Sequence, residues 1–379
     1  MEEIVKEQQN QLNKVEEIDS AEKKVENIDQ DKHQSDDEED SGKKEVSEKD
    51  KLVNQKLEDF YNDYYLTDFQ KFAVAKFLRE NVAVGKPSVT RIREWLMNKL
   101  NGVNKPTDCP ALQRGCPEVI PGLRAYPFWD SQNLPWIQKI QDNYEVIKQE
   151  LLSLRNQKGF QPYRGPSWTS DIKAKDGVGR KSNDSGDWNV FYLFLHNIKF
   201  EENCKKVPKT IEIIENIFPR HYHHAFFSAV TPGTHIMKHH GPTNKKLRFH
   251  MPILGVKNSR LRAGDITLNQ EEGKCYVFDD SFEHEAWHDG DETRIVLIVD
   301  IWHPDLSSEE VKFLSLLQNA KMRAEKIISE QDAANDNFYK IIEMSKDLLN
   351  SNDWWTDNNK ETLQQFESQK SEEKNTISS

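Results

Sequence analysis

The sequence predicts a mainly antiparallel β core, a sandwich or jelly roll, with helical extensions before and after it. Short runs of β-branched and aromatic residues follow one another between turn signals from about residue 165 to residue 306. Apolar residues at helical spacing precede and follow these runs. The chain has 379 residues, which is enough for one large domain with extensions and a sizeable buried core.

The two ends of the chain differ in composition from the rest. Residues 1–55 are rich in Glu, Lys, Asp, Gln and Ser, with "SDDEEDSGKKE" at the centre, and residues 356–379 have a similar composition. Such segments bury too little apolar surface to offset the entropy lost on ordering. We therefore expect a disordered acidic tail over 1–55 and a second disordered tail over 356–379.

Helices are expected on both sides of the β core. A helical N-terminal unit should span 56–105, with "KLEDFYNDYYLTDFQKFAVAKFLREN" as one helical run and a second helix that begins at Ser88. C-terminal helices should span 307–355, and Ser307 and Glu310 are spaced as a capping box at their start.

The β core itself should span 106–306. It opens with a Pro-rich connection and one helix from Pro135 to Gly159, and "PKTIEIIENIF" predicts a further helix inside it. The predicted strands are "NVFYLFL", "HAFFSAV", "KLRFHMPIL", "KCYVF" and "TRIVLIVDIW".

Charge and targeting signals limit the class of partner. With 52 Lys and Arg against 64 Asp and Glu, the net charge is −12, which gives no electrostatic reason to expect a nucleic-acid partner. No apolar run approaches the roughly 20 residues of a membrane span, and the N-terminus lacks the features of a signal peptide. We expect a cytoplasmic protein with free thiols, although Cys109 and Cys116 flank a short loop and would be able to pair in an oxidising compartment.

Strand periodicity sorts the side chains of "KKLRFHMPIL" into two faces. Leu247, Phe249 and Met251 share one face, while Arg248 and His250 share the other. If the sheet curls around an interior, Arg248 and His250 converge there. The alternative is a polar edge that faces solvent.

An arginine opens the most apolar of the predicted strands. Arg294 precedes a run that is apolar on both faces, which is typical of a strand buried on both sides. A buried guanidinium needs an anion, so Arg294 is a candidate clamp for a small organic acid unless it extends to water. Ser228 shares a strand face with Phe226 and Val230 and is placed to donate a second hydrogen bond.

Histidines near two strand ends suggest a metal site. His239 and His240 are adjacent, so only one of them can face inward from a strand, and the spacing leaves open which one. His284 lies in the second segment, where Glu283 and Glu285 should point to the opposite side. Two histidine ligands leave coordination positions open, which suits O₂ chemistry better than a closed zinc site.

Five segments of the sequence resemble those of a known family. "PGLRAYPFWD", "GDWNVFYL", "PGTHIMKHHGPTNKKLRFHMPI", "EEGKCYVFDDSFEHEAWH" and "RIVLIVDIWHP" are long, ordered matches over about residues 110 to 306 to the aspartyl/asparaginyl β-hydroxylases, which are Fe(II)- and 2-oxoglutarate-dependent dioxygenases. The resemblance implies a cupin-like double-stranded β-helix. It also implies O₂ and 2-oxoglutarate as cosubstrates and hydroxylation of the β-carbon of Asp or Asn in a protein or peptide substrate.

The resemblance also implies roles for single residues. His239 and His284 match the iron ligands, so the resemblance selects His239 over His240. Gly241 stands where most oxygenases of this fold carry a ligating carboxylate, and in the family water fills that place. Asp279 or Asp280 would then either act from outside the ligand shell or cap a strand end.

The anion-binding residues follow in the same way. Arg294 and Ser228 match the residues that hold the distal carboxylate of 2-oxoglutarate, and Arg294 completes the catalytic set with the two histidines. Arg248 and His250 match the pair near the other carboxylate and the keto group. Two further readings remain open: an oxygenase of this family that acts on a lipid or small molecule, and a non-catalytic β-helix binding module.

Overall fold

The computed structural model describes residues 48–103, 105–106, 108–130, 134–155, 157, 159–165, 169–174 and 179–331. The chain divides after Leu52 into two compact units, and the fold described below belongs to the second, Val53–Ser379. The tail predicted over 356–379 lies outside the described residues, as do most of the tail over 1–55 and the predicted C-terminal helices after residue 331.

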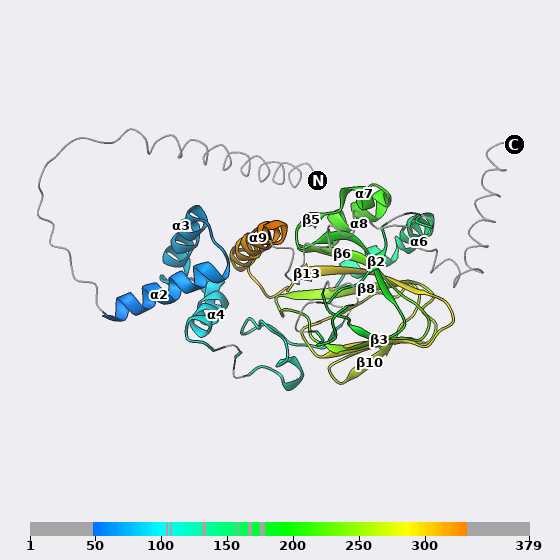
Figure 1. Cartoon of the computed structure of the whole chain (residues 1–379), viewed down its shortest axis with the longest axis horizontal. Coiled ribbons are helices and arrows are strands. Elements are labelled where there is room, and N and C mark those ends of the chain that lie inside the picture. Colours follow the sequence, from blue (N-terminus) through cyan, green and yellow to red (C-terminus); the bar gives the residue numbers. More distant parts are fainter. Residues whose placement is uncertain are drawn as a thin grey trace, which may run out of the picture. The chain divides into compact units, whose positions relative to one another are not determined.

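Two antiparallel sheets form the core (Figure 1). The larger sheet has the order β1-β11-β8-β13-β6-β4-β2, with β5 paired to β4, and the smaller has the order β10-β9-β12-β7-β3. The larger sheet consists of β1 (Phe128–Trp129), β2 (Gln161–Pro162), β4 (Trp188–Leu195), β5 (Ile198–Lys199), β6 (His221–Val230), β8 (Lys246–Leu254), β11 (Tyr276–Phe278) and β13 (Arg294–Trp302). The smaller consists of β3 (Asn183–Ser185), β7 (Thr234–His239), β9 (Ser259–Ala263), β10 (Ile266–Asn269) and β12 (His284–His288). The predicted mainly antiparallel, cupin-like β core is confirmed.

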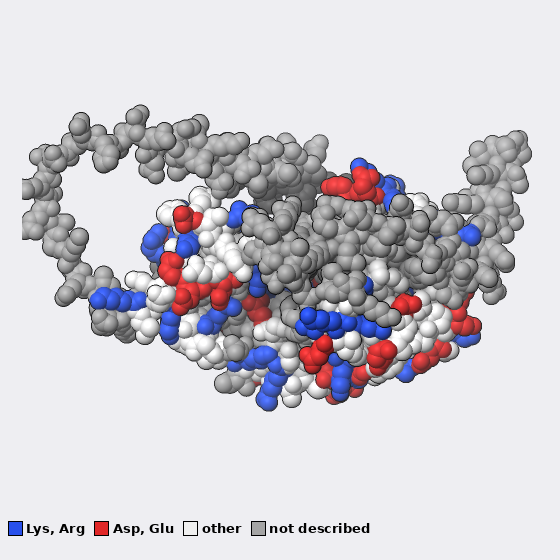
Figure 2. All heavy atoms as spheres, in the orientation of Figure 1, with Lys and Arg blue, Asp and Glu red and all other residues white. Residues whose placement is uncertain are grey.

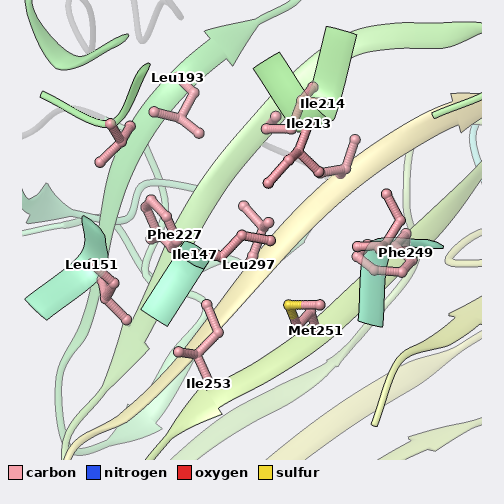
Figure 3. Close-up of a cluster of buried hydrophobic side chains, with 14 of the residues drawn as sticks. Ile147, Leu151, Leu193, Ile213, Ile214, Phe227, Phe249, Met251, Ile253 and Leu297 are labelled. Atoms are coloured by element: carbon pink, nitrogen blue, oxygen red, sulfur yellow. The ribbon is translucent and has the colours of Figure 1, made fainter. Parts of the chain in front are cut away.

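Helices cover the outer face of the larger sheet. Phe249 and Met251 of β8 and Leu297 of β13 pack there against α6 (Tyr144–Ser153) and α8 (Pro208–Ile217) (Figure 3). The alternation predicted for β8 is therefore correct. Arg248 and His250 lie on the opposite, inner face, which is directed toward the smaller sheet.

The inner faces of the two sheets pack against each other. Phe226 and Ile298 of the larger sheet belong to one buried cluster with Ile236, Leu261 and Ala286 of the smaller sheet. Burial of large apolar side chains on both faces explains why β13 is buried along its whole length.

The first helix begins earlier than expected: α2 (Glu48–Asp63) includes residues 48–55, so the prediction of a disordered tail was wrong for these residues. The predicted helical run is interrupted between α2 and α3 (Asp68–Phe77), where Tyr65 adopts a positive φ of 52°. Thr67 and Gln70 form a capping box at the start of α3, so the predicted helical run contains two separate helices. After a π-helical turn, η1 (Leu78–Val82), and a 3₁₀ turn, η2 (Pro87–Val89), α4 (Thr90–Leu100) follows; Ser88 lies in η2 and does not cap it.

Of the other predicted helical features, one helix is divided in the structure and one capping box is confirmed. The helix predicted from Pro135 is split into α5 (Trp136–Gln141) and α6, because the chain turns at Asp142 and Asn143. The capping box of Ser307 and Glu310 is confirmed at the start of α9 (Ser308–Gln331), with both hydrogen bonds formed. Two short helices complete the set, η3 (Ala111–Gln113) and α7 (Glu201–Cys204).

A second apolar cluster joins the N-terminal helices to α9. Phe60 of α2, Trp95 of α4 and Phe313 of α9 belong to it together with Trp302 at the end of β13. The four cysteines are buried free thiols, as expected. Among the described residues, none of the helices combines the length and apolar character that a bilayer crossing requires.

Candidate active site

Two histidines from distant parts of the chain lie side by side in the smaller sheet. His239 ends β7 and His284 begins β12, and the two are direct cross-strand partners. Their ring centroids are 4.1 Å apart. The structure thus brings together the two predicted metal ligands. Among the described residues, no group of three or more His, Cys, Asp or Glu side chains is arranged to hold a metal ion.

Hydrogen bonds to the backbone orient both imidazole rings. Nδ1 of His239 lies 2.8 Å from the carbonyl oxygen of Met237. Nδ1 of His284 lies 2.9 Å from the carbonyl oxygen of Phe282. A carbonyl oxygen only accepts, so each Nδ1 carries the hydrogen and donates it, and each Nε2 keeps a free lone pair.

Both histidines are neutral near pH 7. Burial lowers the pKa of His239, and burial together with the adjacent His239 lowers the pKa of His284 well below its ordinary value. Neutral imidazole is the form that ligates a metal. Two neutral rings with free Nε2 atoms and Nδ1 groups held by the backbone fit a divalent metal ion, because metal-binding histidines commonly donate their second ring N–H to such a partner.

The neighbouring His240 is held away from this pair. Its Nδ1 lies 2.9 Å from the carbonyl oxygen of Ser281, and a Cβ added at Gly115 would overlap its ring. The sequence left open which of the two adjacent histidines faces inward. In the structure, His239 is the one that lies beside His284. Glu283 and Glu285 point to the outer face, as predicted, where both bind Arg262. Figure 2 shows other acidic and basic side chains lying beside one another on the visible surface.

A carboxylate from another segment occupies the space next to Gly241. A Cβ at Gly241 would lie 2.6 Å from Cγ of Asp280. The Oδ2 atom of Asp280 lies 2.7 Å from Nζ of Lys246 and 3.3 Å from Nη1 of Arg248. Its Oδ1 is buried without a hydrogen-bond partner among the described residues. Asp280 therefore fills the volume that a side chain two positions after His239 would take.

Gly241→Ala should lower the free energy of unfolding by about 1–3 kcal/mol, as overpacking of a closely packed interior usually does. The reason is that the buried Lys246 and the partly buried Arg248 hold Asp280 and prevent it from moving aside. Urea denaturation of the single variants and of the double variant with Asp280→Ala would measure the effect. We expect the cost of Gly241→Ala to fall sharply when Asp280 is absent, and additive effects would contradict the close contact.

The neighbouring Asp279 has a structural environment. Its Oδ1 accepts hydrogen bonds from the backbone N and the Oγ of Ser281, and its Oδ2 accepts one from Gln113 of η3. Burial raises the pKa of Asp279 to about 7, although the hydrogen bonds of Ser281 oppose this. Asp279 thus anchors the turn before β12, in keeping with the strand-end alternative left open by the sequence.

Arg294 is a buried cation without an ion pair among the described residues. It begins β13, is 2% exposed and lies across from Val230 on the inner face. Its Nε has no hydrogen-bond partner among the described residues. Burial lowers the pKa of Arg294 to about 10, a shift that Tyr276 opposes. Because an uncompensated buried guanidinium is costly, the position fits a site for an external anion.

Ser228 lies diagonally next to Arg294. Its direct partner on β13 is Val296, two residues along the strand from Arg294 on the same face. Trp188 donates its Nε1–H to the Oγ of Ser228 over 3.0 Å, so the hydroxyl hydrogen of Ser228 remains available for a ligand. Tyr163 stacks on Trp188 with ring centroids 3.7 Å apart and holds the indole in place.

Arg248 already has counter-ions within the protein. Its Nε and Nη2 donate to the two carboxylate oxygens of Asp300 over 2.8 and 2.9 Å, and Nη1 contacts Asp280. Burial alone would lower the pKa of Arg248, but Asp300 and Asp280 raise it. A guanidinium has five N–H groups, so these three contacts leave two for a ligand. Lys246 joins the network through both carboxylates.

His250 and Gln161 are further buried polar groups on the inner face. Nε2 of His250 has no hydrogen-bond partner among the described residues, and neither amide atom of Gln161 has one. Gln161 on β2 pairs with Val190, which in turn pairs with Ser228. The sequence did not identify Gln161, because a two-residue strand carries too little periodicity to be recognised.

Comparisons with known proteins concern the segment of the chain that contains these residues. The family model described as Aspartyl/Asparaginyl beta-hydroxylase matches residues 141–304. The chain is 32% identical over 203 residues to the aspartyl/asparaginyl beta-hydroxylase of Homo sapiens, covering 52% of this chain and 25% of that protein. It is 34% identical over 182 residues to the ornithine lipid ester-linked acyl 2-hydroxylase of Rhizobium tropici, covering 47% of this chain and 61% of that protein.

Solved structures give a weaker likeness. The crystal structure of a predicted oxalate decarboxylase from Thermotoga maritima is similar over 39% of this chain and 96% of that chain, with 10% sequence identity and a TM-score of 0.24. The family-model match is the stronger likeness, and residues 141–304 include the paired histidines and the buried arginine. Over this segment the chain is similar to the aspartyl/asparaginyl β-hydroxylases, a family of hydroxylases.

Proposed function

We propose that the protein is an Fe(II)- and 2-oxoglutarate-dependent dioxygenase that hydroxylates the β-carbon of Asp or Asn residues in a protein substrate. One observation carries this proposal. The inner faces of the two sheets hold a pair of neutral imidazoles with free Nε2 atoms and a buried guanidinium that has no counter-ion within the described part of the chain. A divalent metal and a dicarboxylate would together satisfy these groups.

Each side chain would have a separate task. His239 and His284 would hold the iron through Nε2, and Arg294 with the hydroxyl of Ser228 would hold the distal carboxylate of 2-oxoglutarate. The remaining N–H groups of Arg248 and Nε2 of His250 would meet its other carboxylate and keto group. Bound iron would supply the redox chemistry that couples decarboxylation of 2-oxoglutarate to succinate and CO₂ with transfer of oxygen from O₂ to the substrate carbon.

Burial of these groups would favour the reaction in two ways. The surrounding aromatic side chains keep the local dielectric low, so each charge-assisted hydrogen bond to the cosubstrate would be stronger than in water. The ion pairs of Arg248 hold its side chain in one orientation before the cosubstrate arrives. The cosubstrate would therefore meet donors that are already in place.

The relatives that the chain matches suggest two substrate classes. The chain spans a quarter of the human relative's length and about three fifths of the bacterial lipid hydroxylase's length. The greater coverage of the second relative favours, as an alternative, an acyl chain or another small molecule as substrate. A non-catalytic binding module would have little use for a buried unpaired guanidinium, which costs stability when no ligand is present.

Succinate formation by the full chain would test the oxygenase proposal. We expect the protein, reconstituted anaerobically with Fe(II) and then supplied with 2-oxoglutarate and O₂, to release succinate above background. His239→Ala should abolish the release, whereas His240→Ala should retain it, because the ring of His240 is hydrogen-bonded to the carbonyl of Ser281 and packs against Gly115. Equal succinate release by the wild type and His239→Ala would contradict the proposal.

The same assay can separate the two substrate classes. Asp- and Asn-containing peptides and ester-linked acyl lipids would be supplied in parallel, and the products would be analysed for a gain of one oxygen, about 16 Da. A hydroxylated peptide would support the proposed protein substrate. A hydroxylated lipid with unmodified peptides would support the alternative.

A further inference from the structure

A chain of three buried side chains ends at His250. Tyr276 on β11 is the direct cross-strand partner of His250 on β8, and its Oη lies 2.8 Å from Nδ1 of His250. Gln270, which follows β10, donates from its Nε2 to the same Oη over 2.6 Å. All three residues are buried, so bulk water does not compete for these hydrogen bonds.

The directions of these hydrogen bonds follow from the groups themselves. The amide nitrogen of Gln270 can only donate, so the phenolic oxygen of Tyr276 accepts there. The phenol hydrogen then points to Nδ1 of His250, which must accept it with a lone pair. A neutral imidazole that accepts at Nδ1 carries its hydrogen at Nε2.

We call the two hydrogen bonds that link Gln270, Tyr276 and His250 the relay. Burial favours the protonation states that the relay requires. Burial raises the pKa of Tyr276, so the phenol keeps its hydrogen. Burial, together with Arg294 and Arg248, lowers the pKa of His250 well below its ordinary value, so the ring stays neutral. The ring is also held edge-on against Phe278, with centroids 5.0 Å apart.

We propose that Tyr276, oriented by Gln270, is a positioning residue that fixes His250 in the Nε2–H tautomer and so presents a hydrogen-bond donor to the cosubstrate. This inference rests on the proposed function, because it assigns the donor to a carboxylate or keto oxygen of 2-oxoglutarate. Nε2 of His250 is buried and has no partner among the described residues, which is the state expected of a donor that awaits a ligand. In the other tautomer, a nitrogen lone pair would face the ligand oxygen and repel it.

Two measurements on the same proteins would test the relay. The first is the tautomer of His250, read from two-bond ¹⁵N–¹H correlations of the ring in metal-free protein, which needs no activity. We expect the Nε2–H form in the wild type and loss of that single form in Tyr276→Phe. The second is the affinity for 2-oxoglutarate, measured by calorimetry with Mn(II) in place of Fe(II). The Kd should rise about 10- to 100-fold in Tyr276→Phe, the range expected when a hydrogen bond to a charged group is lost.

Tyr144→Phe is the matched control. The hydroxyl of Tyr144 also lies near β8, 3.1 Å from the carbonyl oxygen of Ile253, and it contacts the carboxylate of Glu272 but not His250. This variant should leave both the tautomer and the Kd unchanged, which separates the relay from a general loss of a tyrosine hydroxyl.

The possible outcomes are distinct. An Nδ1–H tautomer in the wild type, which a Gln270 amide turned by half a rotation would produce, would overturn the relay. So would a Tyr276→Phe protein with the tautomer and Kd of the wild type. A changed tautomer with an unchanged Kd would remove the role in cosubstrate binding. A wild type that binds no 2-oxoglutarate would reject the proposed function, while the tautomer would still decide the relay.

Discussion

Replacing Arg294 with methionine should weaken 2-oxoglutarate binding by two to three orders of magnitude, the size of effect expected when one partner of a buried charge pair is removed. The same change should stabilise the protein when no ligand is bound. Burial lowers the pKa of Arg294 to about 10 from an ordinary value of 12.5. This shift corresponds to a destabilisation of the charged form by about 3 kcal/mol. We expect a gain of about 1–3 kcal/mol, because methionine also loses some packing.

Calorimetry with 2-oxoglutarate and urea denaturation of the ligand-free protein would measure both effects of Arg294→Met. Arg294→Lys is the control: it keeps the charge but lacks the planar fork that contacts a carboxylate at two points, so it should bind with intermediate affinity. Unchanged affinity in Arg294→Met, or a loss of stability in the absence of ligand, would show that Arg294 has a different role.

Asp300→Asn should be among the most destabilising single changes in the β core. The Asp300 carboxylate is buried and contacts Arg248, Lys246 and His224 over 2.8–3.1 Å. Neutralising it leaves the buried Lys246 and the partly buried Arg248 with less compensation, and breaking a buried pair typically costs about 3–5 kcal/mol. Asp289→Asn, at an exposed ion pair with Arg260, should change stability by less than about 0.5 kcal/mol.

The pH dependence of this effect has a defined sign. Burial would raise the pKa of Asp300, but Arg248 and Lys246 hold it well below its ordinary value. The stabilisation is therefore present above the ordinary carboxyl pKa of about 4 and is lost as the pH falls below it. Urea denaturation at pH 7.5 and at progressively lower pH should show the gap between wild type and Asp300→Asn closing in acid. A gap that does not depend on pH would contradict the ion-pair explanation.

Local patterns predicted the parts of the molecule where periodicity is strong. The alternation of β8 placed Arg248 and His250 on the inner face, and the apolar run of β13 predicted a strand buried on both faces. The capping box at Ser307 was also correct. Thr67 and Gln70 have the same spacing and start α3 in the middle of the predicted helical run, where periodicity alone does not mark a boundary.

The ion-pair network around Asp300 could be identified only from the tertiary structure. Asp300 interrupts the otherwise apolar run "RIVLIVDIW", and a carboxylate in a fully buried strand requires a cation, so a partner for Asp300 could have been predicted from this residue. The sequence did not show that Lys246 and Arg248 on the neighbouring strand would supply that partner. Nor did it show that Arg248 would use three of its donors within the protein, because strand pairing sets these contacts.

If His239, His284 and Arg294 form one site for a metal ion and a dicarboxylate, binding of the metal should strengthen binding of 2-oxoglutarate. Calorimetric titration of 2-oxoglutarate should give a much lower Kd in Mn(II)-loaded wild type than in metal-free protein, since two ligands that contact each other strengthen each other's binding. In the double variant His239→Ala/His284→Ala, added Mn(II) should no longer lower the Kd. Equal affinity with and without metal in the wild type, or a metal effect that survives in the double variant, would contradict a shared site.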